Sequence, residues 1–453
     1  MRILHFSLGP SPLRSGGLVR YVEDVSTGQA QCGHSVMVLF PGFSSIQLNR
    51  RATIQHYSFD NDVKYVSIQN GAPLPLLHGI KDPRRIEELT NRLDYRTVEE
   101  FFGDEVPDVF HIHTLMSLPL SLVKFFAAKG TRIVYTSHDY YGLCMKVNLI
   151  DAAKRSCSGP APIKCEQCNV SSKSFLYLWV RNSKFVLSLK RPLARLGGWI
   201  SRKSSPISAP LEKGSFVSKN ALSYSSLLRY HREVFSFVNV FHFNSTLTKD
   251  FYLSLLGSVP LSKVLPVVHK GIYDRRSVRS AKKHVRLGFI GSFDAYKGFP
   301  LLKNALEQIM VEGFNNWTLD AWGNFGNIPS GVESRIKYRG RYNGGDLNYV
   351  FSEMDLLIVP SWRETFSLVT LEALSFGVPV MVSKNVGAKD LLPDSFKEFV
   401  FEVRVDDLVD KIRKVLSNTD ALESFNDWIF HAKLPLDFSA HLLELQKVYQ
   451  MKS

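Results

Sequence analysis

The sequence lacks any apolar run long enough to cross a membrane. A transmembrane helix needs roughly 18–20 consecutive apolar residues, and no uninterrupted run of that length occurs in the 453 residues. Residues 1–6 also lack the long apolar core and small-residue cleavage site of a signal peptide. With 45% hydrophobic and 22% charged residues, the composition is that of a globular protein. We expect a cytoplasmic protein.

Cysteine is scarce, with five residues in the chain, but four of them lie within 25 residues of one another. These four, in the spacing C-x12-C-x7-C-x2-C, are Cys144, Cys157, Cys165 and Cys168. In a chain expected in the reducing cytoplasm, clustered thiols indicate a metal site rather than disulfides. We therefore predict a structural Zn site formed by the four cysteines, with a reduced loop that binds no metal as the alternative.

Acidic residues are nearly absent between positions 171 and 235, where twelve Lys or Arg stand against Glu212 and Glu233. This stretch holds +10 of the formal net charge of +14. Within residues 173–203, a helical projection separates a basic side from an apolar, aromatic side. Such a segment suits an anionic membrane surface, or it packs on the domain core with its arginines in water. We expect no nucleic-acid partner, because no recognisable nucleic-acid-binding module is present.

Short apolar runs alternate with helical patterns through most of the chain, which predicts α/β domains with parallel sheets. The length fits two or three domains. A polar and basic stretch, residues 274–283, indicates the linker between two of them.

The most informative stretch is residues 359–382, whose pattern is that of a strand, a polar loop, a helix and a second strand. Glu364 lies in the loop and Glu372 follows eight residues later. Doubly wound sheets bind ligands at such loops, and two carboxylates there can accept hydrogen bonds from sugar or ribose hydroxyls. The order Pro-Ser, Glu-Thr-Phe-Ser, Leu-Glu-Ala-Leu and Gly-Val-Pro-Val resembles the Glu-x7-Glu signature of retaining glycosyltransferases of family 4.

A second loop, residues 291–298, follows an apolar strand pattern and precedes a helix. It has a glycine at each end, and Lys297 can neutralise a diphosphate with help from the helix N-terminus. The loop is not a Walker loop, because the order Gly-x4-Gly-Lys-Ser/Thr is absent. The family often has Arg directly after the first glycine, whereas this chain has Ser292.

The resemblance implies the GT-B fold, in which two Rossmann-like, doubly wound α/β domains face a central cleft. On this basis we assign residues 1–275 to an N-terminal, acceptor-side domain that includes the cysteine loop and the basic segment. Residues 276–430 are assigned to a C-terminal domain that binds the nucleotide sugar. Residues 431–453 are expected to form a helix that crosses back to the first domain.

The resemblance also implies roles for individual residues. His138 lies just beyond a predicted strand and is expected to contact the transferred sugar, with Glu364 and Lys297 as the other catalytic residues. Glu372 is expected to bind the ribose hydroxyls. The full set expected to bind the donor is Gly16, Gly17, Gly291, Ser292, Lys297, Gly323, Arg339, Glu364, Thr365, Phe366, Ser367, Leu368 and Glu372.

We predict a retaining glycosyltransferase that moves a sugar from a nucleoside diphosphate sugar to a saccharide acceptor without a catalytic cofactor or metal. The Asp-x-Asp triplet at residues 60–62 lacks the sequence setting of a metal-binding motif. The basic segment suggests a lipid-linked acceptor, a peripheral place on the inner face of the cytoplasmic membrane, and a role in O-antigen, capsule or lipopolysaccharide synthesis. The alternatives are a sugar-nucleotide epimerase of the same fold and a non-catalytic protein that binds nucleotide sugars.

Overall fold

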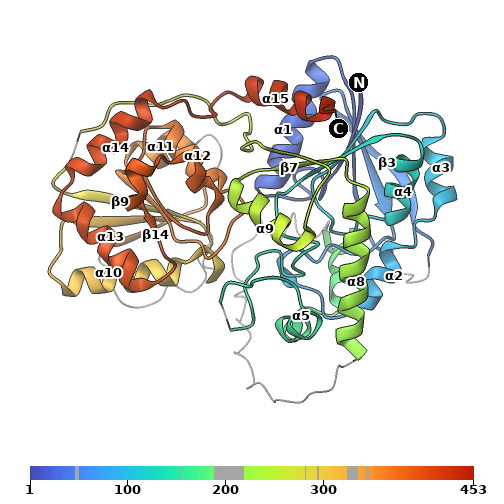
Figure 1. Ribbon diagram of the computed structural model, residues 1–453, viewed down its shortest axis with the longest axis horizontal. Coiled ribbons are helices and arrows are strands. Elements are labelled where there is room, and N and C mark those ends of the chain that lie inside the picture. Colours follow the sequence, from blue (N-terminus) through green and yellow to red (C-terminus); the bar gives the residue numbers. More distant parts are fainter. Residues whose placement is uncertain are drawn as a thin grey trace. The chain divides into compact units, whose positions relative to one another are not determined.

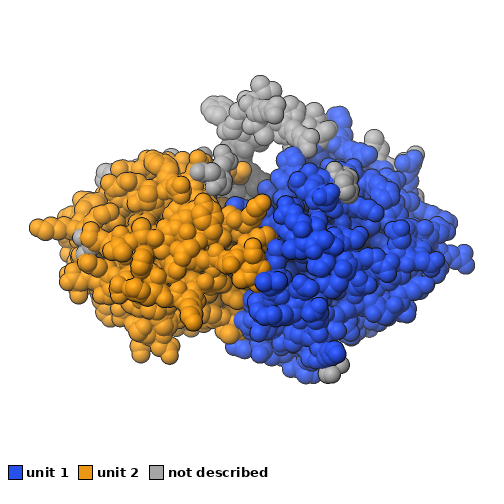
Figure 2. All heavy atoms as spheres, turned by 90° about the horizontal axis from the view of Figure 1, so that it is seen from above, with its two compact units in different colours: residues 1–244, 249–265, 442–453 blue, residues 245–248, 266–441 orange. Residues whose placement is uncertain are grey.

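The computed structural model describes residues 1–45, 50–153, 155–187, 219–280, 282–292, 295–323, 335–342 and 346–452. The chain forms two compact units, coloured separately in Figure 2. The first comprises residues 1–244, 249–265 and 442–453, and the second comprises residues 245–248 and 266–441. Most of the basic segment predicted at residues 173–203 lies outside the described residues, because its description stops at residue 187.

The first unit is built on an eight-stranded sheet in the order β3-β4-β2-β1-β5-β6-β7-β8, in which only the β3–β4 pair is antiparallel (Figure 1). Its strands are β1 (Arg2–Phe6), β2 (Ser35–Pro41), β3 (Thr53–Asp60), β4 (Val63–Gln69), β5 (Val109–Ile112), β6 (Arg132–Thr136), β7 (Val240–Phe243) and β8 (Leu261–Val264). The strand order reverses between β1 and β5, which makes the loops after these strands a place for ligands.

Helices and one short 3-10 turn accompany this sheet. They are α1 (Gly17–Gln31), η1 (Leu76–His78), α2 (Pro83–Thr90), α3 (Tyr95–Phe102), α4 (Leu120–Ala128), α5 (Pro162–Asn169), α6 (Phe175–Arg181), α8 (Lys219–Ser236), most of α9 (Thr246–Leu256) and most of α15 (Phe438–Gln450). The C-terminal helix α15 therefore ends in the first unit, where the Tyr449 hydroxyl bonds to Gln29 and His111.

The Asp-x-Asp triplet forms a tight hairpin turn between β3 and β4. Asp60 pairs with Val63, and the two residues between them, Asn61 and Asp62, have φ values of 48° and 60°. Two-residue hairpins favour Asn and Asp at such positions because these residues tolerate positive φ. The triplet therefore forms the turn of an edge hairpin.

The second unit is built on a six-stranded parallel sheet in the order β11-β10-β9-β12-β13-β14. The strands are β9 (Val285–Ile290), β10 (Trp317–Trp322), β11 (Ile336–Gly340), β12 (Leu356–Val359), β13 (Val380–Ser383) and β14 (Val400–Phe401). The helices and 3-10 turns are η2 (Ala295–Lys297), α10 (Phe299–Val311), α11 (Leu347–Ser352), α12 (Leu368–Ser375), η4 (Gly387–Leu391), η5 (Asp394–Phe399), α13 (Val405–Ser417) and α14 (Asp420–His431).

The apolar runs form strands because parallel strands covered by helices are buried on both faces. Every residue of β5, β7, β12 and β13 is buried, and the side chains of Leu356 and Leu357 are inaccessible to solvent. The second unit has the doubly wound order, with its reversal between β9 and β12. The expected α/β class with two parallel-sheet domains is confirmed.

The first unit ends at Leu265, ten residues before the boundary expected at residue 275, and the chain returns to it at residue 442 rather than 431. The physical reason is that residues 266–280 pack with the second unit. His269 bonds to the Glu372 carboxylate, and the backbone N–H of Arg275 donates to the Ser375 carbonyl. The polar stretch that resembled a linker is therefore part of the second unit.

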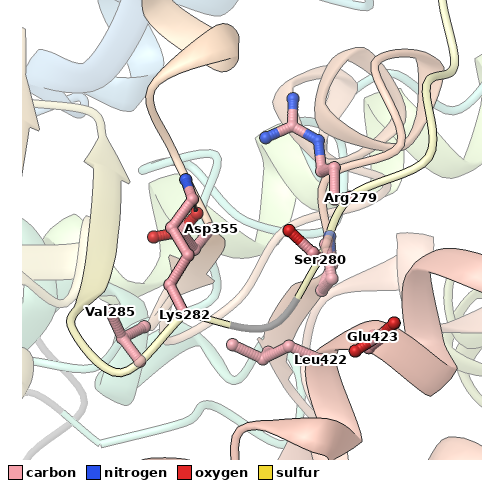
Figure 3. Close-up of a pocket in the computed structure, with 8 residues that line it drawn as sticks. Arg279, Ser280, Lys282, Val285, Asp355, Leu422 and Glu423 are labelled. Carbon is pink, nitrogen blue, oxygen red and sulfur yellow. Dashed lines mark hydrogen bonds and ion pairs between the residues drawn. The ribbon is translucent and has the colours of Figure 1, made fainter.

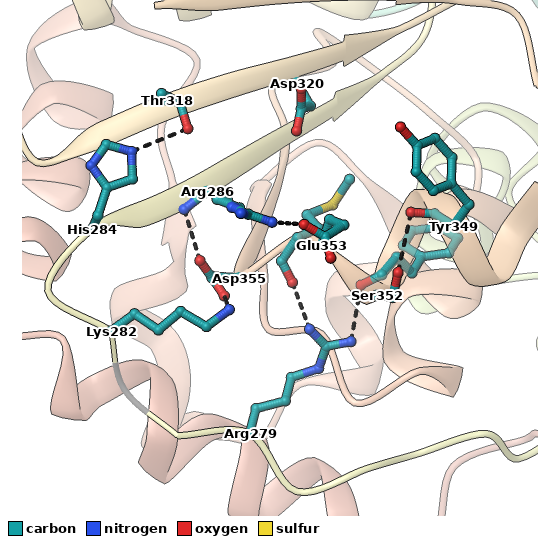
Figure 4. Close-up of polar contacts among 12 residues, drawn as sticks. Arg279, Lys282, His284, Arg286, Thr318, Asp320, Tyr349, Ser352, Glu353 and Asp355 are labelled. Atoms are coloured by element: carbon teal, nitrogen blue, oxygen red, sulfur yellow. Dashed lines mark hydrogen bonds and ion pairs between the residues drawn. The ribbon is translucent and has the colours of Figure 1, made fainter.

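Basic side chains clamp this stretch onto the C-terminal ends of three helices. Figure 4 shows the Arg279 guanidinium and hydrogen bonds that it donates. Arg279 donates from Nη1 to the Met354 carbonyl at 2.7 Å and from Nη2 to the Phe351 carbonyl at 2.9 Å and the Phe376 carbonyl at 3.3 Å. Arg276 donates to the carbonyls of Ile429 and Ala432. The last carbonyls of a helix lack intrahelical donors and carry partial negative charge, so guanidinium groups stabilise them.

Beside this clamp lies a small pocket lined by Lys282, Val285, Asp355 and Leu422, among others (Figure 3). Lys282 Nζ lies 2.7 Å from Asp355 Oδ1, and Asp355 Oδ2 accepts from the backbone N–H of Arg286 at 2.8 Å. These contacts fix the amino ends of β9 and β12. Ligands bind at the carboxyl ends of such strands, so the pocket is at the opposite edge of the sheet from the expected donor loops.

Replacing Arg279 by Ala should lower the free energy of unfolding of the second unit by about 3 kcal/mol, because three carbonyls lose a charged donor. Arg279→Lys should recover only part of this loss, since an ammonium cannot reproduce the planar fork. The matched control is Lys282→Ala, whose ammonium is half exposed in its pair with Asp355 and should cost less than about 1 kcal/mol. Urea unfolding measures all three; equal losses for Arg279→Ala and Lys282→Ala would contradict the clamp.

Among the described residues, no helix is both long enough and apolar enough to span a bilayer.

Candidate functional site

The candidate donor site in the second unit is assembled from the loops that follow β9 and β12. These strands are neighbours at the reversal of strand order, and helices α10 and α12 begin directly after the two loops. The N-terminus of a helix offers unpaired N–H groups and partial positive charge to an anion. The loops predicted from the sequence therefore lie at the edge of the sheet where a nucleotide would bind.

The Lys297 ammonium and the Glu364 carboxylate, one from each loop, form an ion pair with Nζ 3.0 Å from Oε2. Both side chains are mostly buried, 24% and 15% exposed. The Ser361 hydroxyl donates to Glu364 Oε1, and the Trp362 N–H donates to the Tyr296 carbonyl at 2.8 Å. The structure thus brings together the two residues that the sequence analysis named as the catalytic cation and carboxylate.

Close backbone contacts hold the loops together. Gly298 has φ +75°, and a Cβ there would lie 1.8 Å from the Pro360 carbonyl oxygen. Gly323, after β10, has φ +146°, and a Cβ there would lie 1.8 Å from the Gly291 carbonyl oxygen. Gly298 and the predicted donor residue Gly323 therefore allow neighbouring loops to touch, the latter at the carbonyl of Gly291. Ser292 follows in a half-buried position.

Replacing Gly298 by Ala should lower donor affinity at least tenfold, about 1.4 kcal/mol, because Pro360 and the loop it begins must move away. Gly313→Ala is the matched control: it has a similar φ of +91°, but its Cβ would meet nothing within 4 Å. The control should show only the backbone cost of a positive φ, on the order of 1 kcal/mol of stability. Titration of both variants with the preferred donor measures the difference, and equal affinities would contradict the role of the contact.

The loop from Glu364 to Ser367 is braced by the segment after β13. The Glu364 N–H donates to the Asn385 carbonyl, and the Glu364 and Phe366 carbonyls accept from the N–H groups of Gly387 and Ala388. The Thr365 carbonyl accepts from the hydroxyls of Ser245 and Thr248. Ser367 has φ +100°, which strains a non-glycine residue at the start of α12, the helix that begins with Leu368. The predicted residues of this loop thus form one braced turn.

Glu372 lies on α12 and is 7% exposed. Its Oε1 is 3.0 Å from His269 Nε2, while His269 Nδ1 accepts from the Gly271 N–H at 3.0 Å. Since Nδ1 accepts, Nε2 carries the proton and donates to the carboxylate. His269 was not among the predicted site residues. The signal for it in the sequence was His-Lys-Gly directly after an apolar run.

Arg339, which was predicted to bind the donor, forms an ion pair with Asp320. It lies on β11, and its Nε is 2.7 Å from Asp320 Oδ1 on β10, which raises the pKa of the guanidinium. Its described ion pair therefore links the two strands rather than the Lys297–Glu364 loops, and its role toward a nucleotide stays a prediction.

Gly16 and Gly17 lie at the start of α1 in the first unit and are exposed. Gly16 has φ +124°, and a Cβ there would meet nothing within 4 Å. No side chain caps this helix. The first helical N–H groups are therefore open to an anion, as expected for a loop after the central strand β1.

His138 lies directly after β6 in the same unit. Its Nε2 is 3.0 Å from His113 Nδ1, and its ring packs against Tyr21 with the centroids 4.8 Å apart. Burial raises the pKa of the neighbouring Asp139 to about 7, although the carboxyl accepts from the Tyr141 N–H. The structure thus gives His138 a buried histidine partner that the sequence analysis did not foresee.

Five histidines gather in this unit: His5 on β1, His111 and His113 at β5, His138, and His242 on β7. Burial lowers the pKa of His5 and His242 to about 4 and that of His113 well below its usual value. His5, His113 and His242 are therefore neutral near pH 7. Their sequence signal was His-x-His at 111–113 and lone histidines in three other strand patterns.

The four clustered cysteines do not form a set of closely spaced metal ligands. Among the described residues, the group of at least three ligand atoms near enough for one ion is His5, His111 and His113, within 4.8 Å of one another. Burial raises the pKa of Cys144 to about 11 and that of Cys165 to about 12, so both thiols are protonated near pH 7 unless a bound metal deprotonates them. The thiols do influence one another's pKa. The structural Zn site therefore stays a prediction.

Two family models match the sequence, one within each of the two units. The family model described as "Glycosyltransferase Family 4" matches residues 15–162, and that described as "Glycosyl transferases group 1" matches residues 284–418. Together they cover more than half of the chain. The O-antigen chain mannosyltransferase B of Escherichia coli is 28% identical over 115 residues, 25% of this chain and 29% of that protein. The chain spans about a third of the length of the curated relatives it matches.

Two solved structures share the fold over 99% of this chain. WaaG, a glycosyltransferase involved in lipopolysaccharide biosynthesis, has a TM-score of 0.57 at 16% identity and is covered completely. Alr3699/HepE of Anabaena, in complex with UDP-glucose, has a TM-score of 0.56 at 13% identity with 99% of its chain covered.

Proposed function

We propose that this protein transfers a sugar from a nucleoside diphosphate sugar to a saccharide acceptor. The protein belongs to the glycosyltransferases of the GT-B type, with a family 4 domain followed by a group 1 domain. The observation that carries the proposal is the Lys297–Glu364 ion pair at the reversal of strand order. It joins a cation suited to a diphosphate and a carboxylate suited to sugar hydroxyls in one place.

Sugar transfer requires stabilisation of the leaving diphosphate, where negative charge grows as the anomeric bond breaks. Lys297 and the N-terminus of α10 supply positive charge from the loop after β9. In the absence of donor, Glu364 holds the ammonium in position. A bound diphosphate competes for the ammonium, and the carboxylate then accepts from hydroxyls of the sugar.

Glu372 is the residue we assign to the ribose hydroxyls. His269 donates to one of its carboxylate oxygens at 3.0 Å, which orients a group whose oxygens are acceptors for hydroxyls. Because His269 belongs to the second unit, this orientation is built into the nucleotide domain itself.

We further assign retention of the anomeric configuration and catalysis without a divalent metal. The resemblance of the Glu-x7-Glu stretch supports retention. The ammonium of Lys297, aided by helix N-termini, supports metal independence because it supplies the charge that a divalent ion would otherwise provide. Excess EDTA should leave transfer unchanged, and loss of activity restored by Mg²⁺ or Mn²⁺ would refute this part.

The acceptor we propose is lipid-linked, at the cytoplasmic face of a membrane, in surface-polysaccharide synthesis. Support comes from the relatives in O-antigen and lipopolysaccharide synthesis and from exposed apolar side chains on and after α6. These are Leu176, Tyr177, Val180 and Phe185, which are 45–71% exposed. The Lys173 ammonium lies 5.3 Å from the centroid of the Tyr177 ring. Apolar and cationic side chains together suit an anionic interface.

The protein should float with phosphatidylglycerol vesicles at low salt, and less so as salt rises, because part of the attraction is electrostatic. The double variant Leu176→Ser/Val180→Ser should lose at least half of this binding. Leu443→Ser, which removes a leucine 62% exposed on α15, is the control and should float like the wild type. Absence of the wild type from the vesicle fraction at low salt would refute membrane association.

Incubation with UDP-, GDP- and dTDP-sugars tests the transfer itself. One donor should raise the melting temperature and, with a saccharide acceptor, yield a glycosylated product and the nucleoside diphosphate. Release of the nucleoside diphosphate with an epimerised free sugar would point to an epimerase instead. Donor binding without any turnover across acceptors would point to a non-catalytic binding protein.

A further inference from the structure

We propose that a one-directional chain of hydrogen bonds in the first unit, anchored on the backbone carbonyl of Leu265, fixes the tautomer of His138. Its importance for sugar transfer rests on the function proposed above, whereas the tautomer itself does not. The chain passes through strands β7, β6, β5 and β1 and helices α15 and α1. Every member belongs to the first unit.

The direction is set at one end. His242 Nε2 lies 2.7 Å from the Leu265 carbonyl oxygen, which can only accept, so Nε2 carries the proton. Burial lowers the pKa of His242 to about 4, which keeps the ring neutral near pH 7 and leaves Nδ1 as an acceptor. The Thr136 hydroxyl, 2.9 Å from this Nδ1, must then donate to it. Thr136 Oγ1 in turn accepts from His111 Nε2 at 2.6 Å.

The chain continues through the C-terminal helix. With its proton on Nε2, His111 accepts at Nδ1 from the Tyr449 hydroxyl at 2.8 Å. The Tyr449 oxygen accepts from the Gln29 amide nitrogen at 3.0 Å, so the Gln29 amide oxygen faces His5 Nε2 at 2.8 Å. His5 therefore donates from Nε2 and accepts at Nδ1.

The last two links reach His138. His5 Nδ1 accepts from His113 Nε2 at 2.9 Å, and His113 Nδ1 accepts from His138 Nε2 at 3.0 Å. In its neutral form, His138 therefore carries its proton on Nε2 and a lone pair on Nδ1. A sugar hydroxyl that bonds to Nδ1 of the neutral ring donates its proton to it, so His138 acts as an acceptor toward the substrate.

The opposite direction fails at the anchor. If every proton shifted to the other side, His242 Nε2 and the Leu265 carbonyl would be two acceptors at 2.7 Å. A buried acceptor pair without a proton costs free energy that no other member recovers. All other members can both donate and accept, so the single carbonyl decides the orientation of the whole chain.

The same reasoning opposes a metal at His5, His111 and His113, although their ligand atoms lie within 4.8 Å of one another. A metal would need lone pairs from all three rings. In the chain of hydrogen bonds, His113 Nε2 carries a proton and donates it to the lone pair of His5 Nδ1. Each ring already has a partner at both nitrogens.

Thr136, Tyr449 and Gln29 are positioning residues in this arrangement. Thr136→Val keeps the shape of the side chain and removes the hydroxyl that joins His111 to His242. Tyr449→Phe removes the link between Gln29 and His111, and Thr136→Ser restores the hydroxyl. Tyr230→Phe is the matched control, because it removes an equally buried hydroxyl that bonds to the Leu118 carbonyl outside the chain.

Proton–nitrogen NMR of protein labelled with ¹⁵N in the histidine rings reads the tautomer directly, with His138→Asn used to assign the signal. In the wild type, Thr136→Ser and Tyr230→Phe, His138 should show only the Nε2–H form at pH 7.5. Thr136→Val and Tyr449→Phe should each show a second, Nδ1–H form. The proposal would be overturned if His138 of the wild type carried its proton on Nδ1, or if Thr136→Val and Tyr449→Phe both showed only the wild-type form. Tightly bound stoichiometric metal would also overturn it.

The spectra separate this proposal from the function. A wild type that transfers no sugar but shows the expected tautomers would refute only the function. If transfer occurs, Thr136→Val should lower kcat at least threefold with the KM for the donor unchanged, and Thr136→Ser should restore it. An altered tautomer without any change in kcat would refute its role in transfer.

Discussion

At pH 5.5 the first unit should be about 3 kcal/mol less stable than at pH 7. Four buried histidines carry this effect. Burial lowers the pKa of His5 and His242 to about 4, that of His231 to about 3, and that of His113 well below its usual value. Unfolding returns each to the ordinary pKa of about 6.5.

The sign follows from proton binding. Between about pH 4 and 6.5 the unfolded state binds protons that the folded state does not, so stability is fully present above pH 6.5 and is lost as the pH falls. Asp139 opposes this: its pKa rises to about 7 in the folded state, so it stabilises the fold as the pH drops below 7. One acid offsets roughly one histidine, and the net loss remains.

Urea unfolding with hydrogen exchange that resolves the first unit measures the change. His231→Phe should make the pH dependence shallower by about one proton, because that ring is buried against Tyr141 and Tyr230 outside the hydrogen-bonded chain. His431→Phe replaces a ring that is 72% exposed and should change nothing. Constant stability from pH 7 to 5.5 would mean that these rings are not buried as neutral groups.

Lys297→Ala should reduce sugar transfer at least tenfold, about 1.4 kcal/mol of transition-state stabilisation. In the proposed mechanism the ammonium faces the growing charge of the diphosphate, and its removal also leaves the Glu364 carboxylate without this ion-pair partner. The fold should persist, because the loops remain joined by the Trp362–Tyr296 backbone hydrogen bond.

The control for this variant is Lys303→Ala, which removes a lysine from the same unit that pairs with Glu307 on α10 at 2.7 Å. Net charge changes equally in both proteins, so only the position differs. Steady-state transfer rates together with melting temperatures separate catalysis from folding. Wild-type rates in Lys297→Ala would remove the residue from the mechanism.

The local sequence was sufficient for the strands and for the loops of the second unit. The run at β12 is apolar throughout because helices cover both faces of a parallel sheet. Glu364 and Lys297 were each identified from their own strand–loop–helix pattern. Their contact with each other is an outcome of strand order, since β9 and β12 become neighbours only when the sheet forms.

Long-range partners could not be predicted in this way. His269 reaches Glu372 across 103 positions, and Tyr449 reaches His111 across 338. No local pattern distinguishes a histidine that bonds to another histidine from one that packs alone. The expected domain boundary differs from the observed one for a related reason. A basic, polar stretch has the composition of a linker, and its place in the second unit depends on the bonds of Arg276 and Arg279 to distant helix ends.

The contacts of Arg276 and Arg279 also decide where the second unit can be separated from the rest of the protein. The group 1 match begins at residue 284, so a fragment cloned from that point would leave Arg276, Arg279 and His269 behind. Such a fragment would expose the ends of three helices and free the carboxylate of Glu372 from its donor. Fragments that begin at residue 266 keep these contacts, and they are the ones suited to separate study of nucleotide recognition.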